Sequence, residues 1–301
     1  MVIAARLFGG WRGWVAVLLL ARLLPLRAGR VLCDSEEGRG CLVADQRDRD
    51  AGVCGLENIM SRSIRVEQRH LAAGVATGAI VAARGVNRGE ILMRVPLNCT
   101  IGVDAVEMTG LGAMLRSVSF KAAALVALAE LPPRLRLSME QVGIVVVLMV
   151  EAARGNRSPW ASYLASLPAS EECHTPLLWT TEQLQWLRGT GVLEFRIRTL
   201  RAVKGIWKAA APWLAFRDDL AGLGVGEEAL LVAWVHFAAR HFIIANASSA
   251  EGVEGAVMVP GLDAVNHCGG VRGRWQVQRS DAGGRAVVLE AGRPFAPGAE
   301  V

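Results

Sequence analysis

The sequence predicts an α+β fold in which a long helical insertion splits a β-rich domain. Short β-prone runs come first, helical periodicity dominates residues 120 to about 245, and strand patterns return after residue 255. An alternating βαβ order, which is typical of a doubly wound parallel sheet, does not fit this succession. We therefore expect one β-rich unit whose two parts flank a block of helices.

Alternating side chains and Gly-containing turns predict the early strands. The runs are Ile80–Ala83, Ile91–Val95 and Thr100–Val103. In the second run Ile91, Met93 and Val95 face one way, whereas Glu90 and Arg94 face the other. This period of two is typical of a half-buried strand.

Capping signals and apolar periodicity predict the helices. Ser138 with Gln141, and Thr180 with Gln183, form two capping boxes, and the helix after Ser138 is expected to end near Gly155. Helical spacing also relates Leu193, Ile197, Leu200 and Trp207, which precede Pro212.

A last helix is expected over residues 227–247. Because His236, Arg240 and His241 interrupt its apolar faces, we interpret it as a core helix and not as a membrane span. After it, Trp275–Arg279 and Arg285–Glu290 flank the turn SDAGG, which predicts a hairpin.

These patterns predict five parts along the chain. They are a leader (1–33), a linker (34–65), an N-terminal β part (66–119), a helical insert (120–239) and a C-terminal β part (240–301).

The charge of the chain is concentrated in the leader. The net charge of +5 comes from 33 Lys and Arg against 28 Asp and Glu, and residues 1–33 hold five arginines and no acid. Residues 34–301 therefore carry 28 basic and 28 acidic residues, which argues against a nucleic-acid-binding protein.

The leader has the layout of a targeting segment. Its apolar run, Trp14–Ala21, has the length of a signal-peptide core, and Ala28-Gly29 offers a cleavage point. We expect a secretory signal or the first half of a bipartite organelle leader, with no stable membrane insertion after its removal. A membrane anchor that tolerates Arg22, or a misassigned gene start, is the alternative.

Cysteine spacing provides no metal site. The six cysteines are Cys33, Cys41, Cys54, Cys99, Cys173 and Cys268, and no pair has CxxC spacing. The first three could pair with one another in an oxidising compartment, or could remain unpaired thiols.

The densest polar cluster is VPGLDAVNHCGG, which contains Asp263, Asn266 and His267. A nucleophile pair of His267 with Cys268 is geometrically poor, because adjacent residues of an extended chain point to opposite sides. On spacing alone, the cluster could be a polar turn whose side chains satisfy backbone groups.

This segment resembles the P-x-x-D-x-x-N-H motif of SET-domain protein methyltransferases, in the subgroup of RuBisCO large-subunit lysine methyltransferase and actin-histidine methyltransferase. Four further segments resemble this subgroup in order and spacing. They are GAIVAARGVNRGEILMRVP (78–96), SPWASYLASLPASEECHTPLLWTTEQLQWLRGT (158–190), FAARHF (237–242) and LEAGRPFAPGAEV (289–301).

The resemblance implies a split, β-rich SET domain and S-adenosyl-L-methionine-dependent methylation of a lysine side chain of a protein substrate. By position, Arg240 matches the arginine that pairs with the cofactor carboxylate, and Asn266 and His267 match contacts to its methionine end and adenine. The backbone around Ala79 and Ile80 would line the cofactor. Asp263 belongs to the same set, mainly as a support of the turn.

Two departures from the family pattern favour alternatives. Ala79 replaces a glycine of the opening motif, so its Cβ would crowd a ligand. The catalytic tyrosine of the family is expected beyond Val301, so no catalytic residue is assigned here. For the same reason, we expect the C-terminal end of the fold to be missing. The tyrosine that is present, Tyr163, matches a structural tyrosine of the family. The alternatives are an inactive SET-fold binding module or a protein-histidine methyltransferase. The leader predicts the secretory pathway or a plastid, and otherwise the cytoplasm.

Overall fold

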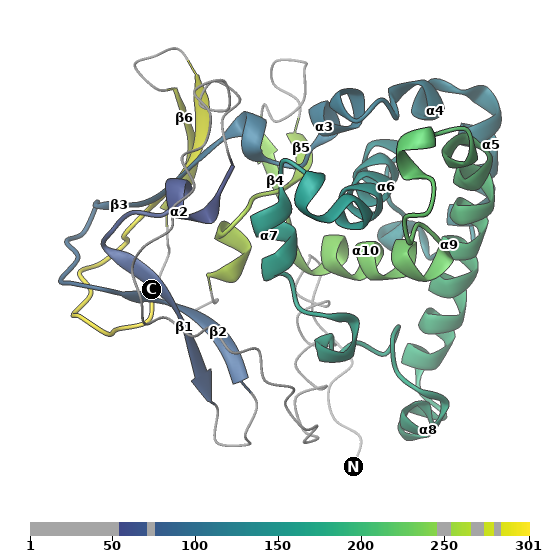
Figure 1. Cartoon of the computed structure of the whole chain (residues 1–301). Helices are drawn as coiled ribbons and strands as arrows, with labels where there is room; N and C mark the ends of the chain where they lie inside the picture. The colour runs from purple at the N-terminus through teal and green to yellow at the C-terminus, as the bar shows by residue number, and fades with distance from the viewer. Residues whose placement is uncertain (1–53, 71–75, 246–253, 266–273, 280–283) are drawn as a thin grey trace.

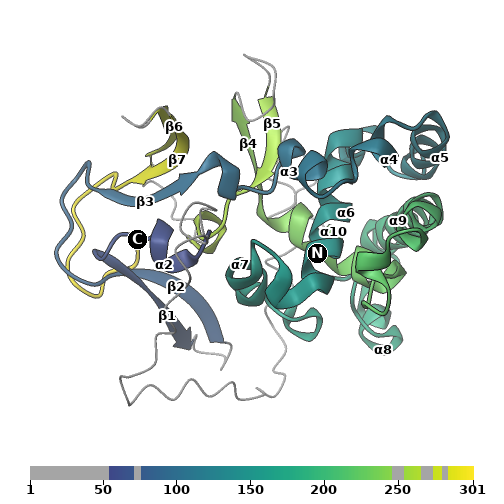
Figure 2. The same cartoon turned by 45° about the horizontal axis from the view of Figure 1, so that its top comes forward.

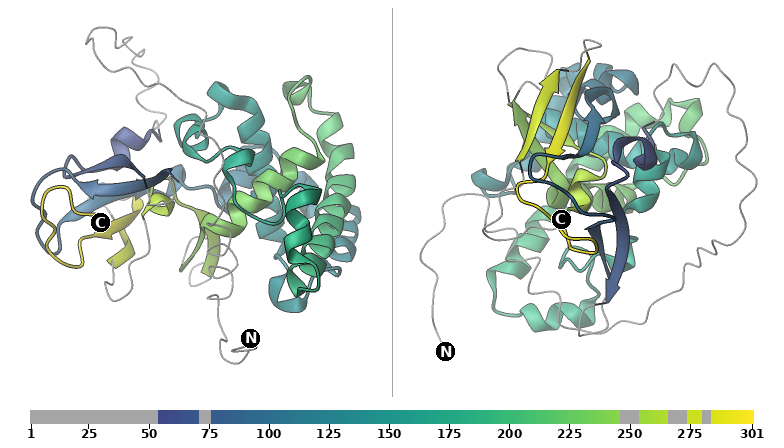
Figure 3. Two further views of the ribbon diagram at one scale, coloured as in Figure 1. Left: turned by 90° about the horizontal axis from the view of Figure 1, so that it is seen from below. Right: turned by 90° about the vertical axis from the view of Figure 1, so that its left-hand side faces the viewer.

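The computed structural model describes residues 54–70, 76–245, 254–265, 274–279 and 284–301. Most strands lie at one side of the molecule, together with the short helix α2, and the other helices lie at the opposite side, as Figure 1 shows. The views in Figure 2 and Figure 3 keep this separation, with β4 and β5 near the boundary. The expected α+β arrangement is confirmed.

Three small antiparallel sheets form the β part. They comprise β1 (Ile64–His70) with β2 (Ala76–Ala82), β3 (Ile91–Pro96) with β7 (Arg285–Glu290) and β6 (Arg274–Arg279), and β4 (His241–Ala245) with β5 (Glu254–Met258). Because β3 precedes the helices and β7 follows them, their pairing confirms that the helical block interrupts one β domain. The predicted hairpin is also confirmed, as β6 and β7.

The prediction for the early strands was wrong in two details. Residues 100–103 form no strand, because only Ile101 makes a bridge, to Met258, before a helix begins at Val103. In β3 the register shifts between Ile91 and Met93, so Leu92 is buried and Ile91 is exposed. A bulge of this kind interrupts the simple alternation of faces.

The helical part begins earlier than residue 120. The longer helices are α5 (Val118–Leu128), α6 (Met139–Arg154), α9 (Gly191–Ala215) and α10 (Glu227–Arg240). The short ones are α2 (Leu56–Ile59), α3 (Val103–Met108), α4 (Gly112–Arg116), α7 (Ala161–Ser166) and α8 (Thr181–Leu184). Both predicted capping boxes are present, at the starts of α6 and α8.

One helix passes through a proline, and another ends earlier than predicted. Helix α9 continues through Pro212, and the burial of Ala210 and Leu214 on either side supports it there. Helix α10 ends at Arg240, not near residue 247, because residues 241–245 pair with β5. No helix among the described residues is both long and apolar enough to cross a bilayer.

The described end of the expected linker is part of the folded domain. Ile59 and Ile64 are buried in the core, and Cys54 forms a disulfide with Cys99. Cys99 is the last residue of the short 3₁₀ segment η2 (Leu97–Cys99), which directly follows β3. The disulfide therefore joins the start of the described chain to the end of β3. Cys54 therefore does not pair with Cys33 or Cys41, which lie outside the described residues.

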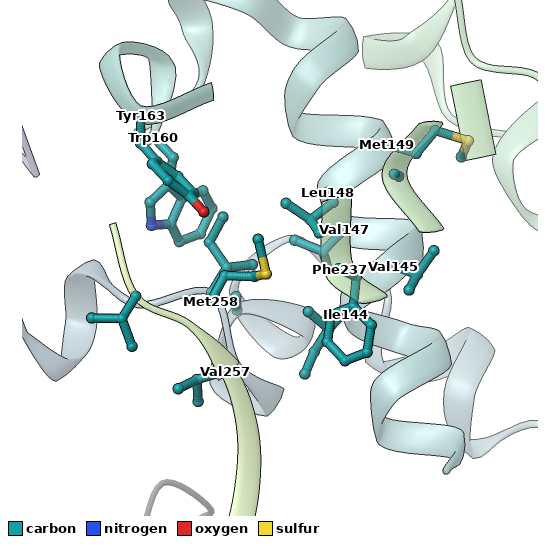
Figure 4. Close-up of a cluster of buried hydrophobic side chains, with 14 of the residues drawn as sticks. Ile144, Val145, Val147, Leu148, Met149, Trp160, Tyr163, Phe237, Val257 and Met258 are labelled. Carbon is teal, nitrogen blue, oxygen red and sulfur yellow. The ribbon is translucent and has the colours of Figure 1, made fainter. Parts of the chain in front are cut away.

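The core runs from the sheets into the helices. Helix α6 buries an unbroken run, Val142–Glu151, against α3, α7 and α10. Figure 4 shows several of its side chains with Trp160 and Tyr163 of the α7 region, Phe237 of α10 and Met258 of β5. The helical insert is thus packed onto the β part and shares one core with it.

Candidate functional site

Arg240 is the last residue of α10, where the helix gives way to β4. A cation is favoured at a helix C-terminus because the last carbonyl groups carry partial negative charge. Its Nη1 lies 3.0 Å from Oδ2 of Asp263, and its side chain is 26% exposed. The ion pair therefore connects the end of the helical insert with the C-terminal β part.

Asp263 lies in the 3₁₀ segment η8 (Leu262–Ala264), directly after a turn at Gly261. Gly261 has a φ of 79°, a backbone conformation that side-chain-bearing residues rarely adopt. The carboxylate is only 2% exposed and accepts two hydrogen bonds of 3.0 Å on Oδ2, from Arg240 and from the hydroxyl of Tyr163. Asp263 thus orients Arg240 and is itself held by Tyr163.

Tyr163, which was expected to be only a structural residue, is a member of this cluster. It lies on α7 and is 1% exposed. Three residues earlier, Trp160 donates its Nε1–H to the carbonyl of Cys99 at 2.9 Å, which fixes α7 against the β part. The W-x-x-Y spacing was the available signal, since it predicts that both rings share a helix face.

Ala79 and Ile80 lie in β2, which is in contact with η8. Both are buried, and the carbonyl of Ile80 accepts the backbone N–H of Val301 at 2.9 Å. The structure therefore brings four predicted residues, Ala79, Ile80, Arg240 and Asp263, into one region. Their contact with a cofactor stays a prediction, and Asn266 and His267 lie outside the described residues.

Burial dominates the electrostatics of the cluster. Loss of hydration raises the pKa of Asp263, while the charge and hydrogen bond of Arg240 and the hydrogen bond of Tyr163 oppose that rise. Burial, and then the charge of Asp263, raise the pKa of Tyr163 well above its usual value. Tyr163 is therefore a neutral hydrogen-bond donor at neutral pH.

Cys173 lies close enough to Arg240 for that charge to affect it. Burial raises the pKa of the Cys173 thiol, and Arg240 acts in the opposite direction. A raised pKa disfavours the thiolate, which is the nucleophilic form. The described part of the site thus has no activated cysteine.

The chemistry of the cluster fits an anionic group. Arg240 makes one hydrogen bond within the described residues, so the other donors of its planar fork have no partner there. Such a fork binds carboxylates well when its position is fixed. Among the same residues, no group of three His, Cys, Asp or Glu side chains could hold a metal ion.

No protein-family model matches the sequence, and no curated protein matches it. Solved structures do resemble the fold. The SET domain of LSMT bound to lysine and AdoHcy has a TM-score of 0.57 at 20% identity, over 81% of this chain and 50% of that one. The same domain bound to methyllysine and AdoHcy has a TM-score of 0.58 at 21% identity, over 81% of this chain and 49% of that one.

Rubisco LSMT bound to sinefungin and monomethyllysine gives a TM-score of 0.56 at 20% identity, over 84% of this chain and 51% of that one. The chain thus spans about half the length of the structures that it matches. At this level of identity the likeness establishes the fold, and the strand pairing around the helical insert agrees with it. The chain has the fold of a SET domain, similar to that of Rubisco LSMT.

Proposed function

We propose that this chain is an S-adenosyl-L-methionine-dependent methyltransferase of the SET type that acts on a protein lysine. The observation that carries the proposal is the position of Arg240, which Asp263 fixes where α10, η8 and β2 meet. The ligands of the similar structures support it, since one holds AdoMet and others hold AdoHcy together with lysine or methyllysine.

The roles of the described residues follow from their contacts. The donors of Arg240 that have no partner among the described residues would bind the carboxylate of the cofactor, whose sulfonium supplies an electrophilic methyl group. Asp263 and Tyr163 are positioning residues, because they hold the guanidinium and are themselves buried. Fixing a ligand in this way contributes to catalysis through orientation.

Calorimetric titration of S-adenosylmethionine tests the cofactor assignment. We expect binding by the parent chain, and a loss of roughly 10- to 100-fold in affinity for Arg240→Lys, which keeps a charge for Asp263 but loses the fork. Lys208→Ala, an exposed cation on α9, is the matched control and should bind as the parent does. Absence of binding by a folded parent would refute the assignment.

A binding module without turnover is the second candidate. It is favoured by the state of Tyr163, which is buried and bonded to Asp263 and so serves as a structural group. Incubation with methyl-labelled S-adenosylmethionine and protein substrates separates the candidates. Label on lysine supports the lysine methyltransferase, and label on histidine shows that the protein is a histidine methyltransferase. Cofactor binding without transfer of label to any substrate supports the binding module.

We also propose that the protein resides in the secretory pathway. The leader and the Cys54–Cys99 disulfide both support this compartment, because disulfides persist mainly where the environment is oxidising. A reporter fused after residue 33 should enter the endoplasmic reticulum, and one fused to a chain without residues 1–33 should not. Import into plastids or a diffuse cytosolic signal would contradict the proposal.

A further inference from the structure

A cavity of about 400 Å³, open to solvent at one side, lies within the helical insert, between α6, α10 and the chain that follows α7. Its walls are almost entirely apolar, with Leu148 and Met149 from α6, Leu167 after α7 and Ala233 from α10. No charged side chain lines it. Its size lies in the range of small-molecule sites, which are mostly apolar with a few polar groups.

One polar side chain of the cavity has no hydrogen-bond partner among the residues that the structure describes. The two polar lining residues are Ser170 and His236, and the hydroxyl of Ser170 is hydrogen-bonded to Glu171. His236 is 8% exposed and makes no hydrogen bond with any residue that the structure describes. Its ring nitrogens are not among the fully buried polar atoms that lack a partner, so they remain accessible to a molecule that enters the cavity.

His236 is neutral at neutral pH. Burial, and then the positive charge of Arg240, lower its pKa to about 4. A neutral imidazole has one N–H donor and one nitrogen acceptor. The cavity therefore presents a single two-way hydrogen-bonding group on an apolar wall.

We propose that this cavity is a binding site for an uncharged, largely apolar ring that carries one N–H or O–H, such as an indole or a phenol. The apolar walls would bury the ring, and His236 would hydrogen-bond to its polar atom. A charged ligand is disfavoured because no lining side chain would compensate its charge. The ring could belong to a free small molecule or to a side chain of a peptide.

This site does not depend on the proposed methyl transfer. His236 lies one helical turn before Arg240, and the cavity is lined by residues of the helical insert alone. Binding is therefore measured without S-adenosylmethionine. A chain that fails to bind that cofactor can still be tested for this site.

The test is titration of the full chain with indole and with indene, which lacks the N–H, by calorimetry. We expect indole to bind about tenfold more tightly than indene, because one hydrogen bond contributes about this factor to affinity. His236→Leu should bring indole to the affinity of indene. Ala229→Leu, at the cavity wall, should weaken both, and Ala122→Leu on the exposed face of α5 should weaken neither.

N-acetyltryptophanamide distinguishes the two sources of the ring. Binding as tight as that of indole supports a peptide side chain, and binding of indole alone supports a free molecule. The proposal is overturned if the folded parent shows saturable binding of none of the three compounds, indole, indene and N-acetyltryptophanamide. That result is expected of a cavity that holds only water. It is also overturned if indole binds Ala229→Leu as tightly as the parent.

Discussion

The indole Nε1–H of Trp160 donates a 2.9 Å hydrogen bond to the carbonyl oxygen of Cys99. Trp160 precedes α7 in the helical insert, whereas Cys99 ends η2 and holds the disulfide to Cys54. Helix α7 also carries Tyr163, which binds Asp263. The disulfide and the Arg240 cluster are therefore supported by the same short helix.

The disulfide is expected to be a major contribution to stability. Replacing both residues in Cys54→Ala/Cys99→Ala frees a loop with a sequence separation of 45 residues. The greater entropy of the unfolded chain should lower the free energy of unfolding by about 4 kcal/mol. Urea unfolding under non-reducing conditions measures the change.

Cys173→Ala is the control for this variant. Cys173 is the free cysteine of the described residues, and its loss should change stability much less than loss of the disulfide. A reductant should destabilise the parent and leave the double variant unaffected. Equal stability of the parent and the double variant would show that the bond contributes nothing.

A buried ion pair at the end of α6 should be sensitive to the loss of one partner. Glu151 is fully buried and pairs with Arg154, which also pairs with Asp219. Arg154→Leu leaves the Glu151 carboxylate buried without its cation, so we expect a loss of about 3 kcal/mol. Thermal or urea unfolding provides the measurement.

The double variant Glu151→Leu/Arg154→Leu tests the cause. It removes both charges, so most of the lost stability should return, because two apolar side chains need no compensation. Asp219 keeps Arg217 as a partner at 2.8 Å in either variant. A double variant as unstable as the single one would attribute the effect to packing.

Local patterns account for the elements that were predicted correctly. The turn sequence SDAGG predicted that β6 and β7 pair, and the starts of α6 and α8 depend on side chains within one turn of the helix. These interactions join near neighbours, so the sequence contains all of their determinants.

Tertiary contacts account for what the sequence could not predict. The helix that was expected to reach residue 247 ends at Arg240 because the following residues pair with β5, whose place depends on the whole fold. Likewise, Cys54 and Cys99 are distant in sequence, and spacing does not determine connectivity. Arg240 and Asp263 were each predicted, but their mutual bond required the folded chain.

The crossing of α5 and α9 requires a glycine. A Cβ at Gly205 would lie 2.5 Å from Cβ of Ala127, and neither backbone can yield easily in packed helices. We expect Gly205→Ala to lower the free energy of unfolding by about 1–3 kcal/mol, despite the better helix propensity of alanine. Gly191→Ala, at the start of α9, meets no atom within 4 Å and should be neutral.

Stability should fall below neutral pH because of His236. Its pKa is about 4 in the folded chain, against an ordinary value of 6.5, so the unfolded chain takes up the proton first. Neutral His236 therefore contributes about 3 kcal/mol to the free energy of unfolding. This contribution is fully present above pH 6.5 and is lost as the pH falls toward 4. His236→Leu should therefore show a drop between pH 7 and pH 4 that is smaller by this amount. Urea unfolding of both chains at the two pH values measures it, and an identical drop in both would rule out His236 as the cause.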